Sequence, residues 1–410
     1  MKNEDTRKRA AGRSTERLPR RLSVCTSTRC AHFYLFERKT AYQRCNTPHP
    51  GLEIVEQDTT MASSQEVETA TAAEQLGSSS LSGSEERKDD ETKPAPKNGT
   101  PMCSECGKKS NTLKKCNGCL CVWYCDKKCQ NKHRKEHKHE CRVIKIILDE
   151  RGGKANLGTE LDVGPLGKVP QQEECPICML ALPIHPKLQG YAACCGKTIC
   201  CGCMYQNQVK SQERPTCAFC RELVLGESDK ETLARALKRV EQKDPNALLN
   251  MALKYGFGQL GLPVDQAKCI ELIRKSADLG CPGAQYQLAV FHKFGQMGLE
   301  QNEEEAFKYY KEAAENGHIF SHNNIGSAHL RKGDFVAAIR HWRLSAAGGL
   351  RSSIKGLIQY GFEDGFLQHG DLAETLQAFY RARAEMKSEG RDDWIAYLKR
   401  NGEYSAEYDL

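Results

Sequence analysis

The chain has 410 residues, of which 39% are hydrophobic and 28% are charged, and its formal net charge is +7 at pH 7. The length leaves room for two to four domains. The sequence contains no apolar run of about 18 residues, which excludes a membrane-spanning helix, and no apolar stretch of the kind that marks a secretory signal follows its basic start. We therefore expect an intracellular protein, cytoplasmic or nuclear, with reduced cysteines.

Residues 1–100 are expected to be disordered. Arginine and lysine are frequent near the start, and residues 59–100 consist mainly of Ser, Glu, Thr, Ala and Lys. A segment of this composition buries too little apolar surface to offset the entropy lost on ordering. Cys25, Cys30 and Cys45 lack the spacing of zinc ligands, and we expect them to be ordinary thiols.

Cysteine is concentrated between Cys103 and Cys220, a stretch that holds 17 of the 22 cysteines in the chain. They form two separate series of paired thiols. Without a secretion signal, such pairs predict metal sites rather than disulfides. Zinc prefers four sulfur or nitrogen ligands in a tetrahedron, and two thiol pairs complete one such site. The two series therefore predict about four zinc ions.

The first series lies in a predicted module, residues 101–141, with few apolar residues. Its candidate ligands are Cys103, Cys106, Cys116, Cys119, Cys125, Cys129, His137 and Cys141. Forty residues with so small a core rarely fold without help. Structural zinc supplies the missing stability, at about 10–16 kcal/mol apparent per site in finger peptides.

This series resembles a MYND zinc finger from Cys103 to Cys141, including the step from Tyr124 to Cys125. The resemblance implies two interleaved zinc sites. One consists of Cys103, Cys106, Cys125 and Cys129, and the other of Cys116, Cys119, His137 and Cys141. The family usually has tryptophan three positions before the ligand histidine, where this chain has Arg134. That departure bears on the family's peptide groove rather than on the zinc sites.

The second series lies in a predicted module, residues 173–224, and consists of Cys175, Cys178, Cys194, Cys195, Cys200, Cys201, Cys203, Cys217 and Cys220. This series resembles an all-cysteine RING finger. The cross-braced pairing of that family implies one site made of Cys175, Cys178, Cys200 and Cys203. The other site takes Cys217 and Cys220, together with two ligands from the middle of the series. For these two we expect Cys194 and Cys195, with Cys201 as the alternative. Lys197 stands where many RING fingers have a ligand histidine, and its ammonium cannot bind zinc.

A RING finger does no covalent chemistry of its own. It holds a ubiquitin-conjugating enzyme and orients the thioester-linked ubiquitin for attack. The resemblance implies that Ile177 contacts the conjugating enzyme and that Arg221 donates hydrogen bonds to both partners. The alternative is that Ile177 packs inside the module and Arg221 is simply exposed.

Residues 142–172 are expected to link the two modules. The apolar run Val143–Leu148 predicts that a helix continues out of the first module, and the glycines that follow predict a loop. Residues 228–405 then show apolar residues at helical spacing. The segment Met251–Gly258 returns 37 positions later as Leu288–Gly295. Units of this kind bury their apolar faces only by stacking, which predicts a solenoid.

The repeats resemble Sel-one-like repeats, relatives of the tetratricopeptide repeat, which implies a surface that binds peptides or proteins. The predicted fold is thus multi-domain: two small zinc-stabilised cross-brace modules, an all-α helical-repeat solenoid and a disordered N-terminal region. Two functions fit this arrangement. One is a RING-type ubiquitin ligase that recruits substrates through the repeats and the MYND-like finger. The other is a non-catalytic scaffold that binds proteins through the same parts.

Nucleic acid is a third and less favoured partner. The stretch Lys108–Lys138 is basic, which is typical of nucleic-acid binding. However, a zinc ion with four thiolates carries two negative charges, and nearby lysines partly neutralise them. Aromatic residues for base stacking are also few, because Trp123 and Tyr124 are neighbours.

Overall fold

The computed structural model describes residues 100–153, 162–210, 216–223 and 229–404. The described residues from Pro101 onward belong to one compact unit. The expected disorder of residues 1–100 lies outside the described part, apart from residue 100. Among the described residues, no helix is long and apolar enough to cross a membrane.

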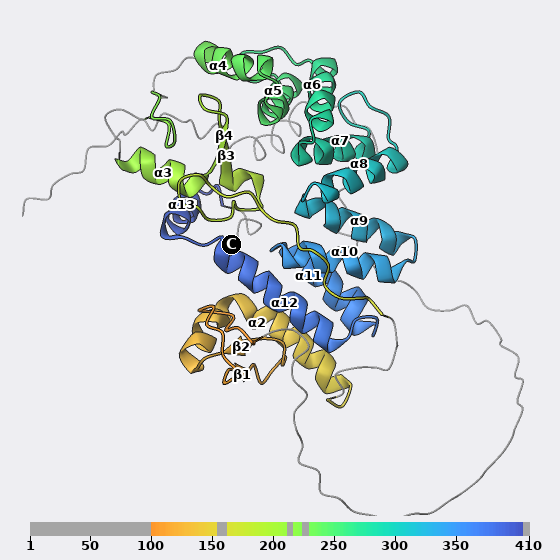
Figure 1. The fold of residues 1–410 in the computed structure, drawn as a ribbon. Coiled ribbons are helices and arrows are strands. Elements are labelled where there is room, and N and C mark those ends of the chain that lie inside the picture. The colour runs from red at the N-terminus through yellow and green to blue at the C-terminus, as the bar shows by residue number, and fades with distance from the viewer. Residues whose placement is uncertain (1–99, 154–161, 211–215, 224–228, 405–410) are drawn as a thin grey trace, which may run out of the picture. The chain divides into compact units, whose positions relative to one another are not determined.

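The first cysteine module combines a two-stranded hairpin with one long helix (Figure 1). Strand β1 (Lys114–Lys115) pairs antiparallel with β2 (Trp123–Tyr124). Helix α2 (Lys127–Glu150) begins after Asp126, whose carboxylate accepts a hydrogen bond from the backbone N–H of Cys129. Such an N-cap satisfies a donor that the first helical turn leaves unpaired. The C-terminal half of α2 buries the apolar residues Ile144, Ile147 and Leu148.

The second module is built on another hairpin. A short 3-10 turn, η2 (Pro186–Leu188), leads into β3 (Gln189–Ala192), which pairs antiparallel with β4 (Lys197–Cys200). Helix α3 (Cys201–Lys210) follows directly. The buried core of this module is small and consists of Cys175, Leu182, Ile199, Cys200 and Cys217.

Helix α4 (Asp229–Glu241) precedes six helices of 13 residues each, which form successive hairpins (Figure 1). These helices are α5 (Pro245–Phe257), α6 (Gln266–Asp278), α7 (Pro282–Phe294), α8 (Glu303–Glu315), α9 (Ile319–Arg331) and α10 (Phe335–Ala347). Each helix packs against the next one in sequence, which confirms the predicted helical-repeat solenoid.

The residues at the helix ends recur with the repeat of 37 residues. Proline opens α5 and α7, at Pro245 and Pro282, where its fixed φ suits the first helical turn. Gly258 and Gly295 end the same helices with φ of 62° and 63°. Residues with a Cβ rarely adopt this left-handed conformation, so glycine is favoured at both positions.

Small residues let the repeat helices approach closely. A Cβ atom at Gly326 in α9 would lie 2.7 Å from the indole of Trp342 in α10. The neighbouring Ile325 is fully buried, as are Ala289 in α7 and Ala338 in α10. The apolar face of each hairpin is therefore covered by the next, as a stacked array requires.

The last helices turn back onto the cysteine modules. Helix α11 (Arg351–Leu357) continues into a π-helical turn, η3 (Ile358–Glu363), and is followed by α12 (His369–Glu385) and α13 (Glu389–Arg400). Helix α12 shares a buried core with the first module, which includes Val122, Tyr124, Ile144, Leu376, Phe379 and Tyr380. Helix α13 shares a smaller core with the second module, made of Leu188, Cys201, Trp394 and Leu398.

Candidate metal centres

The structure gathers the sixteen predicted metal ligands into four groups of four. Within each group, the candidate ligand atoms all lie within 4.8 Å of one another. The first module holds Cys103, Cys106, Cys125 and Cys129 in one group, and Cys116, Cys119, His137 and Cys141 in the other. The second module holds Cys175, Cys178, Cys200 and Cys203, and then Cys194, Cys195, Cys217 and Cys220.

The sulfur spacing within these groups fits zinc. A zinc–sulfur bond of about 2.3 Å makes each edge of a regular tetrahedron about 3.8 Å. The two sulfurs of Cys106 and Cys125 lie 3.5 Å apart, and those of Cys195 and Cys217 lie 3.9 Å apart. A disulfide would bring two sulfurs to about 2.0 Å. The donor sets are therefore compatible with about four zinc ions.

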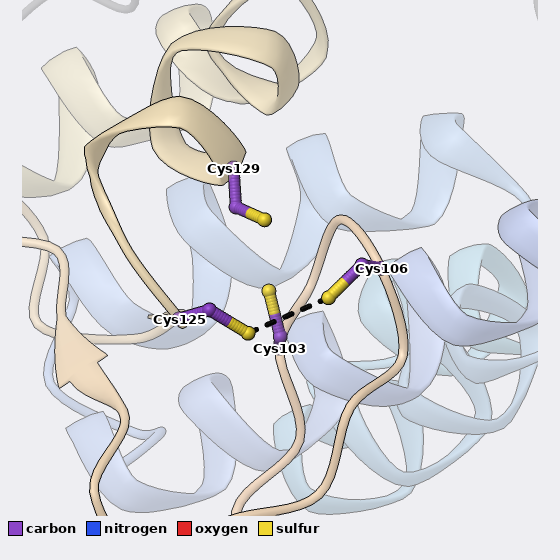
Figure 2. A group of neighbouring side chains, drawn as sticks. All are labelled: Cys103, Cys106, Cys125 and Cys129. Carbon is purple, nitrogen blue, oxygen red and sulfur yellow. Dashed lines mark hydrogen bonds between the residues drawn. The ribbon is translucent and has the colours of Figure 1, made fainter.

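The two groups of the first module draw on different elements. Figure 2 shows the sulfurs of Cys103, Cys106, Cys125 and Cys129 turned toward one another. Cys125 follows β2, and Cys129 lies in the first turn of α2. In the other group, His137 and Cys141 are four residues apart on α2 and so share one helix face. Helix α2 thus contributes ligands to both groups.

Helix α12 supplies a second layer of contacts to the ligand histidine. The Nε2 atom of His137 lies 3.2 Å from the sulfur of Cys119, and its Nδ1 atom lies 3.0 Å from the hydroxyl oxygen of Tyr380. A histidine that binds zinc through Nε2 carries its proton on Nδ1, which then donates to Tyr380. Partners of this kind fix the orientation of the imidazole and raise its basicity as a ligand.

Further polar contacts join α12 to the first module. The ring Nε2 of His369 lies 2.7 Å from the carbonyl oxygen of Cys119. Gln377 donates to the carbonyl of Cys121 at 3.2 Å. The sulfur of Cys121 lies 3.3 Å from the same nitrogen of His369 and outside both ligand groups. These contacts hold the turn that carries Cys119.

Two acidic residues of α2 also pair with basic residues of the C-terminal part of the chain. Glu140 is buried and accepts a hydrogen bond from Arg351, and Glu136 forms an ion pair with Lys387. Arg134, the position of the missing family tryptophan, is exposed. The first module is thus anchored by charge as well as by its apolar face.

In the second module, one buried arginine contacts the group around Cys178. Arg391 of α13 is 2% exposed and donates to the carbonyl oxygens of Ala181 and Met386 at 2.8 and 2.5 Å. Its other terminal nitrogen lies 3.5 Å from the sulfur of Cys178. A guanidinium at this position offsets part of the negative charge of a tetrathiolate site.

The remaining group depends on the adjacent cysteines at the tip of the hairpin. The sulfur of Cys194 lies 3.5 Å from that of Cys220, and Cys195 pairs with Cys217 as described above. Arg239 of α4 donates to the carbonyl of Cys194 at 2.8 Å. Cys201, the alternative ligand, lies outside the group and donates to the carbonyl of Lys187 at 3.5 Å.

The candidate ligands differ in proton affinity. The thiol of Cys200 donates to Cys175 and lowers the pKa of Cys175 to about 4. Burial acts to raise the pKa of Cys103, but the backbone N–H groups of Cys106 and Glu105 lower it to about 7. Hydrogen bonding to Cys175 raises the pKa of Cys200. Zinc must displace protons from such thiols, so metal binding weakens in acid.

The two residues implied to contact a conjugating enzyme lie at the surface of the second module. The side chain of Ile177 is 40% exposed, and that of Phe219, between the last two ligands, is 41% exposed. Arg221 is exposed, has a φ of 64°, and donates to the side-chain oxygen of Asn207 at 3.0 Å. Asn207 in turn donates to the carbonyl of Thr216 at 2.7 Å.

Comparison with known families identifies two parts of the chain. Residues 103–141 match the MYND finger, and residues 245–281 and 282–318 each match the Sel1 repeat. These matches confirm the predicted finger and the predicted repeats.

The similar curated proteins share only a short segment with this chain. One is the histone-lysine N-methyltransferase ASHR1 of Arabidopsis thaliana, 41% identical over 49 residues, which are 12% of this chain and 10% of that protein. Another is a SET and MYND domain-containing protein of Dictyostelium discoideum, 40% identical over 52 residues, with 11% and 10% covered. The chain therefore spans about a tenth of the length of these relatives.

Two solved structures of Sel1-type proteins also resemble parts of this chain. A Sel1 repeat protein from Oxalobacter formigenes is 26% identical with a TM-score of 0.29, and the match covers 31% of this chain and 97% of that one. A protective antigen of uropathogenic Escherichia coli with an SLR fold is 22% identical with a TM-score of 0.32, covering 42% and 36%.

Proposed function

We propose that this chain is a zinc-dependent protein-interaction protein whose second module works as a RING-type ubiquitin ligase. The observation that carries the proposal is the apolar surface of that module. Ile177 lies between the ligands Cys175 and Cys178, and Phe219 lies between Cys217 and Cys220. Both apolar side chains are exposed, although the core of the module is very small. Exposed apolar side chains held on metal-binding loops would offer another protein an apolar contact.

The surroundings of Arg221 support the same reading. A guanidinium has five N–H donors in a planar fork. The bond to Asn207 fixes the side chain and leaves further donors for a docked enzyme and its ubiquitin. The module would act by orientation alone, holding the thioester in a reactive pose for an attacking lysine. The repeats and the MYND finger would recruit the substrate.

The test measures discharge of ubiquitin from a panel of conjugating enzymes by the full chain. Arg221→Ala is expected to slow discharge while binding of the conjugating enzyme stays nearly unchanged, since it removes orientation rather than contact area. Ile177→Ala is expected to weaken binding itself. Val264→Ala, a change of an exposed residue between repeat helices, is the matched control. A wild-type chain that neither binds nor discharges any enzyme of the panel would refute the ligase.

A non-catalytic scaffold is the second candidate, and the contacts of α12 favour it. Because α12 contacts the first module through His369, Gln377 and Tyr380 and also packs against α10 of the repeats, the two parts would present one combined surface to partners. Such a surface needs no conjugating enzyme. The similarity to methyltransferases is confined to about the length of the finger, and we propose no methyl transfer.

A further inference from the structure

The segment between the two cysteine modules lies against α10. We call residues Asp162–Glu173 the linker. Arg340 donates to the carbonyl oxygens of Val163 and Asp162, at 3.0 and 3.3 Å. Val163 is only 3% exposed and belongs to the core shared by α10 and α12. The linker is therefore bound to the repeat by one apolar anchor and by its main-chain carbonyls.

A buried arginine makes a further and shorter contact to a carbonyl of the linker. Arg343 of α10 is 1% exposed and donates to the carbonyl of Gly164 at 2.6 Å. The rest of its guanidinium is held by Glu374 at 2.8 Å and Thr375 at 3.2 Å, both in α12. A donor fixed in this way binds a carbonyl without a further loss of side-chain entropy. The contact recognises main chain, so it does not depend on which residue supplies the carbonyl.

The linker fills this surface incompletely. A half-open pocket of about 270 Å³ remains between linker residues 163–167 and the side chains of Arg340, Arg343 and Leu344. A Cβ atom at Gly167 would meet the nearest atom of Leu344 at 3.5 Å, an ordinary contact distance. An apolar side chain that fills such a pocket removes apolar surface from water. A larger apolar side chain in place of Gly167 would therefore bind more tightly than the linker does.

We propose that α10 carries a binding surface for an extended peptide of a partner protein, and that the linker is its weak built-in occupant. The peptide would place an aliphatic side chain where Val163 lies and a larger apolar side chain where Gly167 lies. Its carbonyls would accept hydrogen bonds from Arg340 and Arg343. The inference rests on the proposed protein-interaction role of the repeats, and it names where on them a partner binds.

The experiment uses the full zinc-loaded chain and a fluorescent peptide with the sequence of residues 162–173 and the change Gly167→Leu. Anisotropy should show about tenfold tighter binding to the Val163→Ser chain than to the wild-type chain, because the built-in occupant has lost its aliphatic anchor. Adding Arg340→Ala, an exposed residue, should weaken the peptide again by several-fold. The same peptide with Gly167 retained is the matched probe and should bind less tightly.

Equal affinity for the wild-type and Val163→Ser chains, or no binding to the latter, overturns the proposal. If the Val163→Ser chain fails to fold, Gly167→Leu in the chain itself gives the answer. The Gly167→Leu change should slow hydrogen exchange of the linker amides by about tenfold, because the leucine fills the pocket. Unchanged exchange overturns the proposal. Peptide binding to α10 needs no conjugating enzyme, and ubiquitin discharge depends on the second module. The peptide-binding proposal and the ligase proposal can therefore fail independently.

Discussion

The first cysteine module packs most of its apolar and aromatic residues against α12 and leaves Leu120 exposed, whereas the second leaves several of its apolar residues in solvent. In the first module, Tyr124 is buried, and the ring of His133 meets Tyr380 edge-on with 4.3 Å between centroids. In the second module, Met179 is exposed together with Ile177 and Phe219. The two modules have nearly the same ligand chemistry and differ in what covers them.

This difference separates two uses of zinc. In the first module the metal ions would hold a surface that another part of the same chain already covers. In the second they would hold a surface that stays available to a partner. A small module has too little core to keep either surface in shape without metal. We therefore propose that the face of the first module against α12 serves assembly of the chain, and that the exposed face of the second module serves an external contact.

Removal of zinc is expected to have the largest effect. The wild-type chain should contain four zinc ions, and a chelator should unfold both modules, because about 10–16 kcal/mol per site is comparable with the whole stability of a typical domain. Hydrogen exchange should also rise in α12, which loses its packing partner, while α6 keeps its protection as an internal control. Unchanged protection of α12 would contradict its dependence on the first module.

The loss of the buried arginine should have the next largest effect. Arg391→Met leaves the carbonyls of Ala181 and Met386 without their donor and removes a positive charge near Cys178. We expect a cost of about 3 kcal/mol or more, confined to the second module. Denaturant unfolding, followed by release of zinc, measures it. Arg400→Met, at an exposed site of the same helix, is the control. An equal effect of both changes would show that Arg391 does not support the module.

The spacing of the cysteines predicted paired thiols, and the resemblance to two cross-braced finger families implied the ligand groups that the structure brings together. Paired thiols make a local pattern, and cross-bracing leaves few ways to combine the pairs. The sequence did not decide which two of Cys194, Cys195 and Cys201 complete the site with Cys217 and Cys220, because all three carry a thiol. The structure resolves the placement because Cys201 begins α3, on the side where its thiol meets Lys187.

The residues behind the ligands could not be predicted. Tyr380 and Arg391 lie more than 200 positions from the ligands that they contact, His137 and Cys178. Nothing in a helical pattern distinguishes a tyrosine that packs in a core from one that also accepts a hydrogen bond from a ligand. The linker, too, was predicted only as a loop between modules, because carbonyl contacts to Arg340 leave no trace in the sequence.

A smaller effect is expected at the tyrosine behind the ligand histidine. Tyr380→Phe removes the hydroxyl that meets Nδ1 of His137 but keeps the ring. Changes of this kind typically lower metal affinity by 10–100-fold. Competition with a chromophoric chelator should show one weakened site of four. Tyr310→Phe, a buried tyrosine of α8, should leave all four unchanged. If all four sites of the Tyr380→Phe chain bind zinc as tightly as in the wild-type chain, α12 covers the module without supporting the ligand histidine.

The smallest effect on stability is expected where the proposed external contact lies. Phe219→Ser changes an exposed side chain, so the free energy of unfolding should change by no more than about 0.5 kcal/mol. The matched change in the first module, Val122→Ser, removes a fully buried side chain and should cost about 2 kcal/mol or more. Zinc content and thermal unfolding measure both.

Because Phe219→Ser is expected to leave the fold intact, any loss of partner binding in that chain reports on the surface itself. A large destabilisation by Phe219→Ser would instead mean that this side chain belongs to the core of the module, and the contrast between the two modules would fail.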